Sequence, residues 1–277
     1  MIYSCNVFGI SRQAYYKQKH RYREVQQQVE GVIDKVQQLR TCMPRIGTRK
    51  MYYLLGDDLP IGRDKLFDLL RANYLLIKPK RSYTKTTMSK HWLRKHPNLL
   101  TDLSIVRPEQ VYVSDITYVK SREKTHYLSL ITDAYSRKIV GYHLSDDMNA
   151  DSVVKALKMA MKGRNKNIPL IHHSDRGIQY CSETYQKMLS KYNVTPSMTD
   201  GYDCYQNALA ERVNGILKQE FLFNKCNNYQ NLNALTINAV NIYNNKRPHL
   251  ALNMKTPNFV HQKTDRNRSI GSYKLLV

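Results

Sequence analysis

The sequence predicts an α/β protein with a mixed five-stranded sheet and flanking helices, preceded by an all-α region of helix-turn-helix type. Two observations carry this prediction. Apolar residues follow helical spacing early in the chain, whereas short alternating segments typical of strands begin near residue 110 and then alternate with helices. A chain of 277 residues is long enough for such a core and a smaller module. The predicted organisation is a helical region at 1–77, a basic linker at 78–107, a core with a C-terminal helix at 108–252, and a polar tail at 253–277.

The charge balance indicates a polyanionic partner. The chain has 44 Lys and Arg against 22 Asp and Glu, a formal net charge of +22. Nucleic acid is the leading candidate for such a partner. A solvated basic surface or a ribosomal protein would share this charge. Ribosomal chains, however, are usually shorter and rarely carry isolated carboxylates inside apolar runs.

The cysteines and the apolar runs bear on the compartment. Five cysteines are widely separated and contain no pair at the two-residue spacing of zinc or redox sites: Cys5, Cys42, Cys181, Cys204 and Cys226. We expect free thiols. No apolar run approaches the roughly 18 residues of a membrane span, and the first residues lack a charged leader followed by a long apolar region. We therefore expect no membrane partner and a cytoplasmic protein.

The first 77 residues are predicted to be helical. Ser11 is a suitable N-cap for a short helix over RQAYYKQ, and apolar spacing between Tyr22 and Leu39 predicts a second, amphipathic helix. TRKMYYLL and RDKLFDLLRANYLL then flank the turn-rich connector GDDLPIG, which suits helix-turn-helix geometry. We expect this region to contact DNA. A small helical bundle that only supports the rest of the chain remains the alternative.

The segment from Lys78 to Arg107 is predicted to be a linker. It contains eight basic residues and one acid, Asp102, together with the only tryptophan, Trp92. Its periodicity is mixed. A solvated tether and a segment that follows a DNA groove are both consistent with this composition.

The core is predicted to have the element order βββαβαβα. Three strands over 110–120, 126–134 and 137–145 are close enough in sequence to form a meander. The remaining elements are a helix at 151–162, a strand at 167–174, a helix at 182–192, a strand at 194–199, a helix from near Gln206 and a last helix at 229–245. This order is that of the ribonuclease-H-like fold, by analogy. The tail from Asn253 is expected to be loosely held.

Two aspartates occupy positions where a charge is costly. Asp115 lies inside the first strand, where alternation puts it on the same face as Val111 and Val113. An ionised carboxylate is tolerated on an apolar sheet face when it is paired or binds metal. Asp175 follows the strand at 167–174, at a carboxyl strand end where open α/β sheets place their sites. The two carboxylates converge if their strands are neighbours.

A third carboxylate, Glu211, lies on the helix from near Gln206. It falls opposite the apolar stripe of that helix and shares a face with Gly215 and Lys218, since seven steps of about 100° return to within about 20° of the start. A helix face with one carboxylate, one small residue and one cation would suit a site that binds a metal ion and a phosphate together. Taken alone, Glu211 would be better interpreted as a solvated helix charge.

The spacing of the three acids makes a family resemblance specific. Asp175 and Glu211 are separated by 35 residues. The segments SDITYV, HHSDRGIQY, NALAERVNGILKQE and IYNNKRPHLAL are similar to those of retroviral-integrase-type transposases. The similarity is greatest to the second-frame product (OrfB type) of the third insertion-sequence family, and it covers nearly the whole chain.

The resemblance implies a DNA transposase with a ribonuclease-H-like, integrase-type core. Asp115, Asp175 and Glu211 match the family's catalytic acids, which hold two magnesium ions, with manganese able to substitute. The implied activity is cleavage at insertion-sequence ends and strand transfer into target DNA. The implied partners are these DNAs, further copies of the chain on DNA, and a first-frame product, fused or in complex. A nucleoid-associated bacterial protein is expected.

Several basic residues near these acids are candidate DNA contacts. Lys218 matches a basic residue of the family seven positions after the glutamate, and we expect it to contact DNA beside the site. Arg212, Arg176 and the pair Lys246–Arg247 would suit phosphate, but each is equally consistent with surface charge.

Three further residues near the acids are expected to be structural. Asp133 is interpreted as a turn former with Ser136 and Arg137 rather than as a ligand. His172 and His173 should point to opposite sides of the sheet, and adjacent histidines cannot readily share one metal.

Two other functions remain open at this stage. A non-enzymatic, sequence-specific DNA-binding regulator would explain the charge and the helix-turn-helix pattern but not the three acids. A catalytically silent transposase remnant would keep the whole pattern. A tyrosine recombinase is not supported, because the sequence shows no Arg-His-Arg constellation around one of its 21 tyrosines.

Overall fold

The computed structural model describes residues 7, 9–78, 92–164, 167–200, 207–223 and 226–263. The chain divides into two compact units, Met1–Lys78 and Pro79–Val277. None of the described helices is long and apolar enough to cross a membrane.

The first unit is helical, as predicted, but its first helix is longer than expected. Helix α2 runs without interruption over Arg12–Cys42, and the Ser11 side chain caps it by accepting a hydrogen bond from the Ala14 amide at 3.1 Å. The predicted break before Tyr22 is therefore wrong. The reason is visible in the sequence, since no glycine or proline stands between Arg12 and Glu30 to end the helix.

Two short helices complete this unit. Helices α3 (Thr48–Leu55) and α4 (Arg63–Ala72) flank the 3-10 turn η1 (Gly56–Asp58). Helix α4 ends four residues before the predicted end because Tyr74 adopts a left-handed conformation, with a φ of 56°. The buried apolar side chains of the unit come from all three α-helices and the connection between the first two: Val32, Val36, Met43, Ile46, Met51, Leu66 and Leu70.

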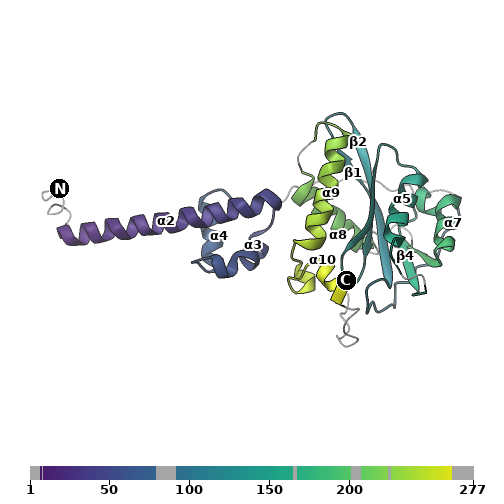
Figure 1. The fold of residues 1–277 in the computed structure, drawn as a ribbon, viewed down its shortest axis with the longest axis horizontal. Coiled ribbons are helices and arrows are strands. Elements are labelled where there is room, and N and C mark those ends of the chain that lie inside the picture. Colours follow the sequence, from purple (N-terminus) through teal and green to yellow (C-terminus); the bar gives the residue numbers. More distant parts are fainter. Residues whose placement is uncertain are drawn as a thin grey trace. The chain divides into compact units, whose positions relative to one another are not determined.

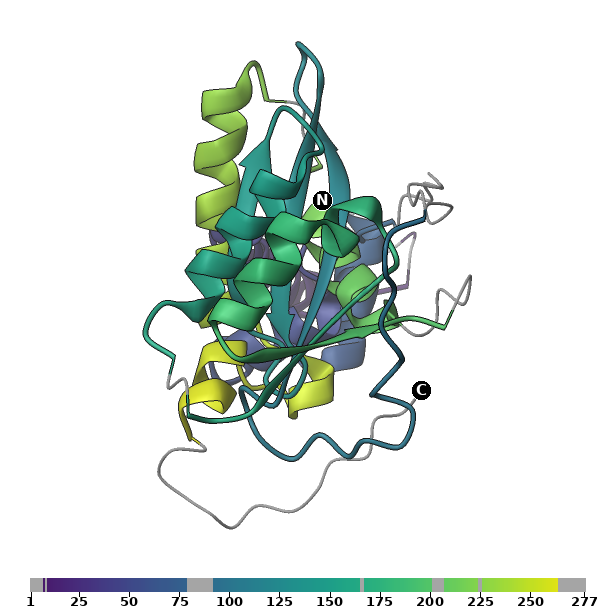
Figure 2. The same cartoon turned by 90° about the vertical axis from the view of Figure 1, so that its right-hand side faces the viewer.

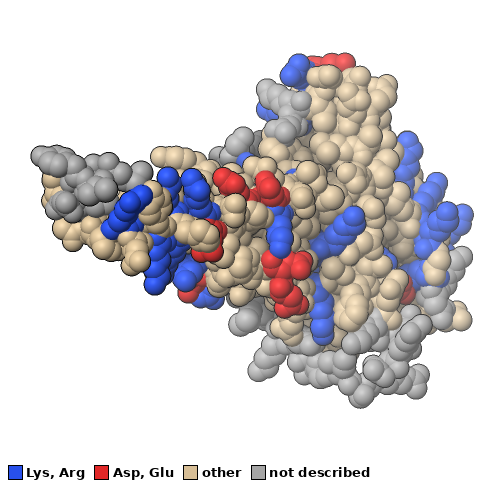
Figure 3. Space-filling model, turned by 60° about the vertical axis from the view of Figure 1, so that its left-hand side comes forward, with Lys and Arg blue, Asp and Glu red and all other residues tan. Residues whose placement is uncertain are grey.

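The N-terminal half of α2 is exposed and basic. Almost every residue from Arg12 to Glu30 is exposed, and this stretch contains five Lys or Arg residues and two glutamates. Figure 3 shows Lys and Arg side chains gathered along this part of the helix. A polyanion would meet few carboxylates here, although the DNA-binding role of the unit remains a prediction.

The second unit contains the predicted mixed five-stranded sheet. Its strands are β1 (Val111–Lys120), β2 (Thr125–Asp133), β3 (Ile139–Ser145), β4 (Leu170–Ser174) and β5 (Val194–Met198). Their spatial order is β3-β2-β1-β4-β5. The first three strands form the predicted antiparallel meander, whereas β4 runs parallel to β1 and β5 runs parallel to β4. The expected fold class is confirmed.

Helices cover both faces of this sheet (Figures 1 and 2). One face packs against α5 (Ala150–Met161), α6 (Ile178–Cys181) and α7 (Glu183–Lys191). The other packs against α8 (Ala208–Ile216), the π-helical turn η3 (Leu217–Phe221) and α9 (Tyr229–Asn245). Side-chain caps start three of these helices, from Asn149, Ser182 and Asn228.

Glycine permits the close packing of α5 on β3. A Cβ atom added at Gly141 would lie 2.2 Å from the carbonyl oxygen of Ala156. No side chain fits in that space, so Gly141 lets the helix backbone approach the strand directly.

Part of the predicted linker packs on the core. Within the described residues 92–107, the carbonyl of Pro97 accepts a hydrogen bond from Met198 of β5 at 3.3 Å. The Leu99 amide donates to Ser197 Oγ at 2.9 Å. Ile105 is buried against the apolar face of β1. This segment therefore contributes apolar residues to the core. Its composition does not show this, because basic residues are so frequent in it.

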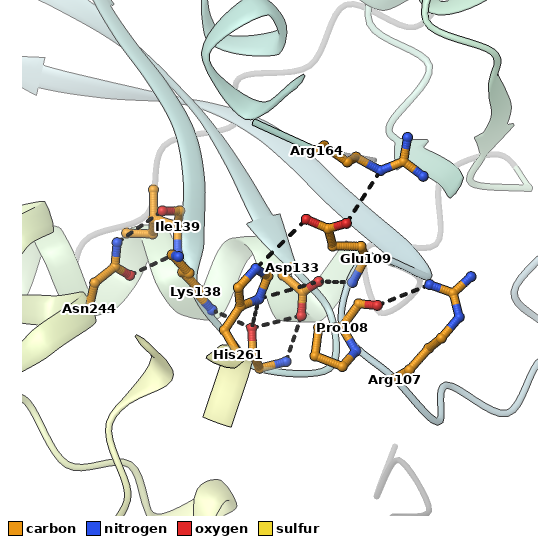
Figure 4. A network of polar contacts seen from close by, with 10 residues as sticks. Arg107, Pro108, Glu109, Asp133, Lys138, Ile139, Arg164, Asn244 and His261 are labelled. Atoms are coloured by element: carbon orange, nitrogen blue, oxygen red, sulfur yellow. Dashed lines mark hydrogen bonds and ion pairs between the residues drawn. The ribbon is translucent and has the colours of Figure 1, made fainter. Parts of the chain in front are cut away.

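Part of the predicted tail also differs from expectation. The 3-10 turn η4 (Leu250–Leu252) is followed by α10 (Pro257–Lys263), which packs on α9. His261 of α10 contacts the Ser136 hydroxyl at 3.0 Å and lies 4.0 Å from both Asp133 and Glu109 (Figure 4). The expectation of a loosely held tail is wrong up to Lys263, and residues 264–277 lie outside the described residues.

Candidate active site

Asp115 lies on the face of β1 that meets α8. Val111 and Val113, on the same face, belong to an apolar cluster that includes Ala210 of α8. The Asp115 side chain is partly buried and well tethered. Its Oδ2 accepts a hydrogen bond from Asn214 Nδ2 of α8 at 2.6 Å, and its Oδ1 accepts one from the Ile116 amide at 2.9 Å.

Asp175 follows the last residue of β4. Because β4 is parallel to β1 and His173 is paired with Val113, Asp175 is level with Asp115 in the sheet. Asp175 Oδ1 accepts a hydrogen bond from the Gly177 amide at 3.0 Å. A Cβ on Gly177 would lie 3.0 Å from the same oxygen, so glycine makes room for the carboxylate.

Glu211 stands on α8, which two asparagines tie to β1. Asn207, just before the helix, donates to the Ser114 carbonyl at 3.1 Å, and Asn214 donates to Asp115. The Glu211 side chain lies between these two anchors and is exposed. Beyond them, Lys218 Nζ donates to Thr117 Oγ1 at 3.3 Å from within the π-helical turn.

The three carboxylates influence one another electrostatically. Burial, followed by the charge of Asp175 and to a smaller extent that of Glu211, raises the pKa of Asp115 to about 7. Burial and the charge of Asp175 also raise the pKa of Glu211. Burial lowers the pKa of the Lys218 ammonium, and Asp115 opposes that shift. Negative charge is therefore concentrated where β1, β4 and α8 meet.

A divalent cation fits this site in donor chemistry and in charge. Carboxylate oxygens are the ligands that magnesium prefers, and a cation would favour the ionised form of Asp115, whose pKa is raised by burial and then by the charge of Asp175. The site is not preassembled, since no three His, Cys, Asp or Glu side chains in the described part of the chain form a group that could hold a metal ion. Of the three acids, Glu211 is the exposed one.

The remaining basic candidates differ in their surroundings. Arg212 is exposed on α8. Arg176, beside Asp175, lies 3.8 Å from the Asp200 carboxylate, and Lys246 is exposed. Arg247 is 2% exposed and forms two hydrogen bonds with Glu220, at 2.6 and 2.7 Å. The suggestion that Arg247 contacts phosphate or forms surface charge is therefore wrong, because its guanidinium is enclosed by the protein.

The residues expected to be structural have structural partners. Asp133 Oδ1 accepts hydrogen bonds from the Ser136 amide and hydroxyl at 2.7 and 2.8 Å, which confirms the turn. His172 Nε2 contacts the Tyr185 hydroxyl and His173 Nδ1 contacts the Ser197 hydroxyl, each at 2.9 Å. Burial lowers the pKa of His172 to about 3, which keeps this ring neutral. The expected free thiols are found at Cys42, Cys181 and Cys226, whereas Cys5 and Cys204 lie outside the described residues.

Sequence reasoning missed Asn214 and Asn207. Asn214 stands three residues after Glu211, a spacing that puts both on one side of a helix. That spacing was an available signal. Asn207 gives no comparable signal, because its hydrogen bond to the backbone of β1 is a tertiary contact across 93 residues.

Comparisons with known proteins identify the family of the chain. Models of the integrase core domain match residues 106–204 and 192–257. The uncharacterized 31 kDa protein of insertion element IS600 from Shigella sonnei is 35% identical, covering 94% of this chain and 97% of that protein. The transposase InsF for insertion sequence IS3fB from Escherichia coli (strain K12) is 31% identical, covering 78% of this chain and 77% of that protein.

A solved structure shares the fold. A chain in the cryo-EM structure of the simian T-cell lymphotropic virus intasome in complex with PP2A regulatory subunit B56 gamma superposes with a TM-score of 0.52. It is 17% identical, and the match covers 86% of this chain and 77% of that one. At this level of identity, the similarity shows a shared fold and nothing more. The family follows from the two relatives and the core-domain matches: the chain belongs to the IS3 family of insertion-sequence transposases and has an integrase-like core.

Proposed function

We propose that this transposase cuts DNA at the ends of an insertion sequence and joins those ends to target DNA, using Asp115, Asp175 and Glu211 as ligands for two divalent cations. The observation that carries the proposal is the placement of these carboxylates: Asp175 is level with Asp115 in the sheet, and Glu211 stands on the helix that Asn214 ties to Asp115. Burial, followed by the charge of Asp175, raises the pKa of Asp115 to about 7 there. Magnesium, or manganese in its place, would activate the attacking oxygen and stabilise the leaving oxygen.

The protein's own part is to hold the acids in place. Asn214 and the Ile116 amide fix the orientation of Asp115, and the Gly177 amide does the same for Asp175. Two protein strands and a tethered helix thus position ligands from distant parts of the sequence. Because Asp115 holds a proton below about pH 7, a cation must displace that proton, and its affinity should weaken as the pH falls.

Cleavage assays separate this proposal from its two alternatives. The full chain, incubated with a duplex that carries the element's end, should nick one strand only when a divalent cation is present. A DNA-binding regulator would bind the same duplex without nicking it, with or without a first-frame partner. A silent remnant would also bind the duplex without nicking it, but its carboxylates would still bind the cation.

The DNA would approach the exposed side of α8. Lys218 and Arg212 stand on or directly beyond this helix, and Arg176 adjoins Asp175. We propose these three as phosphate contacts beside the reacting strand. Because ends must be paired and joined, we further propose that several copies act together on DNA at the bacterial nucleoid, fused to or accompanied by a first-frame product.

Lys218→Ala is expected to lower end cleavage and joining on the order of a hundredfold while lowering DNA affinity only modestly. Total affinity is spread over many charges, whereas a displacement of the reacting strand by about 1 Å can cost that much in rate. Lys187→Ala is the matched control, because Lys187 is an exposed lysine on α7 paired only with Glu183 at 2.7 Å among its described contacts. Single-turnover cleavage at saturating enzyme measures the effect. Equal rates for both variants would make Lys218 an ordinary lysine.

Removal of the first unit is expected to weaken DNA binding and its dependence on salt. Residues 1–78 contain 14 basic and 7 acidic residues, and the slope of log affinity against log salt falls by about 0.9 for every phosphate that the protein no longer neutralises. The cut belongs at Lys78/Pro79, because a cut after Arg107 would also remove Ile105 from the core. Equal slopes for the full chain and residues 79–277 would refute a DNA-contacting role for the first unit.

A further inference from the structure

Asn214 combines two features that its structural role alone does not explain. Its side chain is 4% exposed, and Nδ2 donates a short hydrogen bond of 2.6 Å to Asp115 Oδ2. Its Oδ1, bonded to the same carbon, is buried and has no hydrogen-bond partner among the residues that the structure describes. Burying an amide oxygen without a donor is unfavourable, so such an atom indicates a missing partner.

The position of this oxygen limits what the partner can be. An amide oxygen accepts hydrogen bonds and is also a hard oxygen donor of the kind that magnesium and calcium bind. Lys218, whose ammonium interacts with the Asp115 charge, donates to Thr117 and makes no hydrogen bond to this oxygen. The partner is therefore expected to come with whatever occupies the space beside Asp115.

Asn207 provides an internal comparison. It is also buried, at 5% exposure, and its Oδ1 likewise has no partner within the described ranges. Its Nδ2, however, donates to the backbone of β1 at Ser114 rather than to a carboxylate. Both asparagines anchor α8, but only Asn214 touches a proposed metal ligand.

We propose that Asn214 is a positioning residue for the metal site, an inference that rests on the proposed function. Its Nδ2 holds the Asp115 carboxylate in one orientation, so that this ligand is in place when a divalent cation binds, and its buried Oδ1 is left for a hydrogen-bond donor that arrives with the cation. Groups that orient a metal ligand in this way typically change metal affinity or activity by 10- to 100-fold when they are replaced.

Manganese binding to the full-length chain, followed by electron paramagnetic resonance, tests the proposal without relying on activity. Asn214→Leu removes both polar atoms while keeping the branched shape of the side chain, and it is expected to weaken Mn²⁺ binding by about 10- to 100-fold. Asn214→Ser keeps a hydroxyl and is expected to lose less. Asn207→Ala removes the other anchor of α8 without touching Asp115, and it is expected to weaken Mn²⁺ binding clearly less than Asn214→Leu does, although it should unfold at a lower temperature. Raising the Mg²⁺ concentration should restore end cleavage in Asn214→Leu.

The outcomes are distinguishable from failure of the proposed function. Asp115→Asn should lose Mn²⁺ binding, and if it binds Mn²⁺ like the wild type, the metal site itself is wrong. If Asp115→Asn loses binding but a folded Asn214→Leu does not, only the role of Asn214 is wrong. Equal losses in Asn214→Leu and Asn207→Ala would also overturn it, because anchoring of α8 would then suffice. If Asn214→Leu does not melt cooperatively, the Mn²⁺ affinity of Asn214→Ser is compared with those of Asp115→Asn and Asn207→Ala instead.

Discussion

Replacing Asp115 or Asp175 by asparagine, or Glu211 by glutamine, is expected to abolish strand cutting while DNA affinity stays nearly unchanged. Each substitution removes a ligand charge and little volume. The loss should be at least on the order of a thousandfold, larger than the 10- to 100-fold typical of a residue that only orients a ligand. Single-turnover cleavage and a binding titration on the same duplex measure the two quantities.

Two controls distinguish the loss of a metal ligand from misfolding. Glu183→Gln changes an exposed carboxylate on α7 and should cut DNA at the wild-type rate. Without metal at pH 8, Asp115→Asn should melt at a higher temperature than the wild type. The raised pKa means that Asp115 binds a proton more tightly in the folded state, so its contribution to stability falls as the pH rises towards 7. Any of the three variants that still cuts DNA normally would remove that residue from the site.

Arg247→Met is expected to lower the free energy of unfolding by about 3–5 kcal/mol, the cost of leaving one partner of a buried ion pair uncompensated. The Glu220 carboxylate would remain, with its side chain only 17% exposed. Arg247 also lies 5.9 Å from the centre of the Tyr243 ring, a contact that methionine replaces only in part. Thermal or urea unfolding of the full chain measures the loss.

Two companion variants make this prediction specific. Lys246→Met changes the exposed neighbour of Arg247 and should alter stability by no more than about 0.5 kcal/mol. The double variant Arg247→Met with Glu220→Gln should recover much of the loss, because the unpaired buried charge is then absent. If Lys246→Met is as destabilising as Arg247→Met, the ion pair does not carry the effect.

Most of the sheet could be predicted from local sequence. Alternation in QVYVSDITYVK placed Asp115 on the face of Val111 and Val113, and the structure shows that face packed against α8. The last long helix was predicted at 229–245, the bounds that α9 has. Both signals are repeated over many residues, which makes them readable without tertiary information.

The features that sequence reasoning missed depend on single tertiary contacts. Arg247 looked like surface charge because its partner, Glu220, is 27 residues away on another element. The π-helical turn Leu217–Phe221 changes the phase of the helix around Lys218, and no residue type in that turn predicts it. Asn214 was missed although it stands three residues after Glu211, because the sequence does not show the contact with Asp115 that explains this spacing.

The most direct test of the central claim is one cleavage reaction of the full chain on an end-containing duplex, stopped with denaturant and resolved for both DNA and protein. Metal-dependent attack by water predicts a nicked strand with a free 3′-hydroxyl in the presence of Mg²⁺, none with a chelator, and no protein joined to DNA. Cleavage that persists in the chelator, or DNA covalently attached to the chain, would contradict the assignment of Asp115, Asp175 and Glu211 as metal ligands that carry out the reaction.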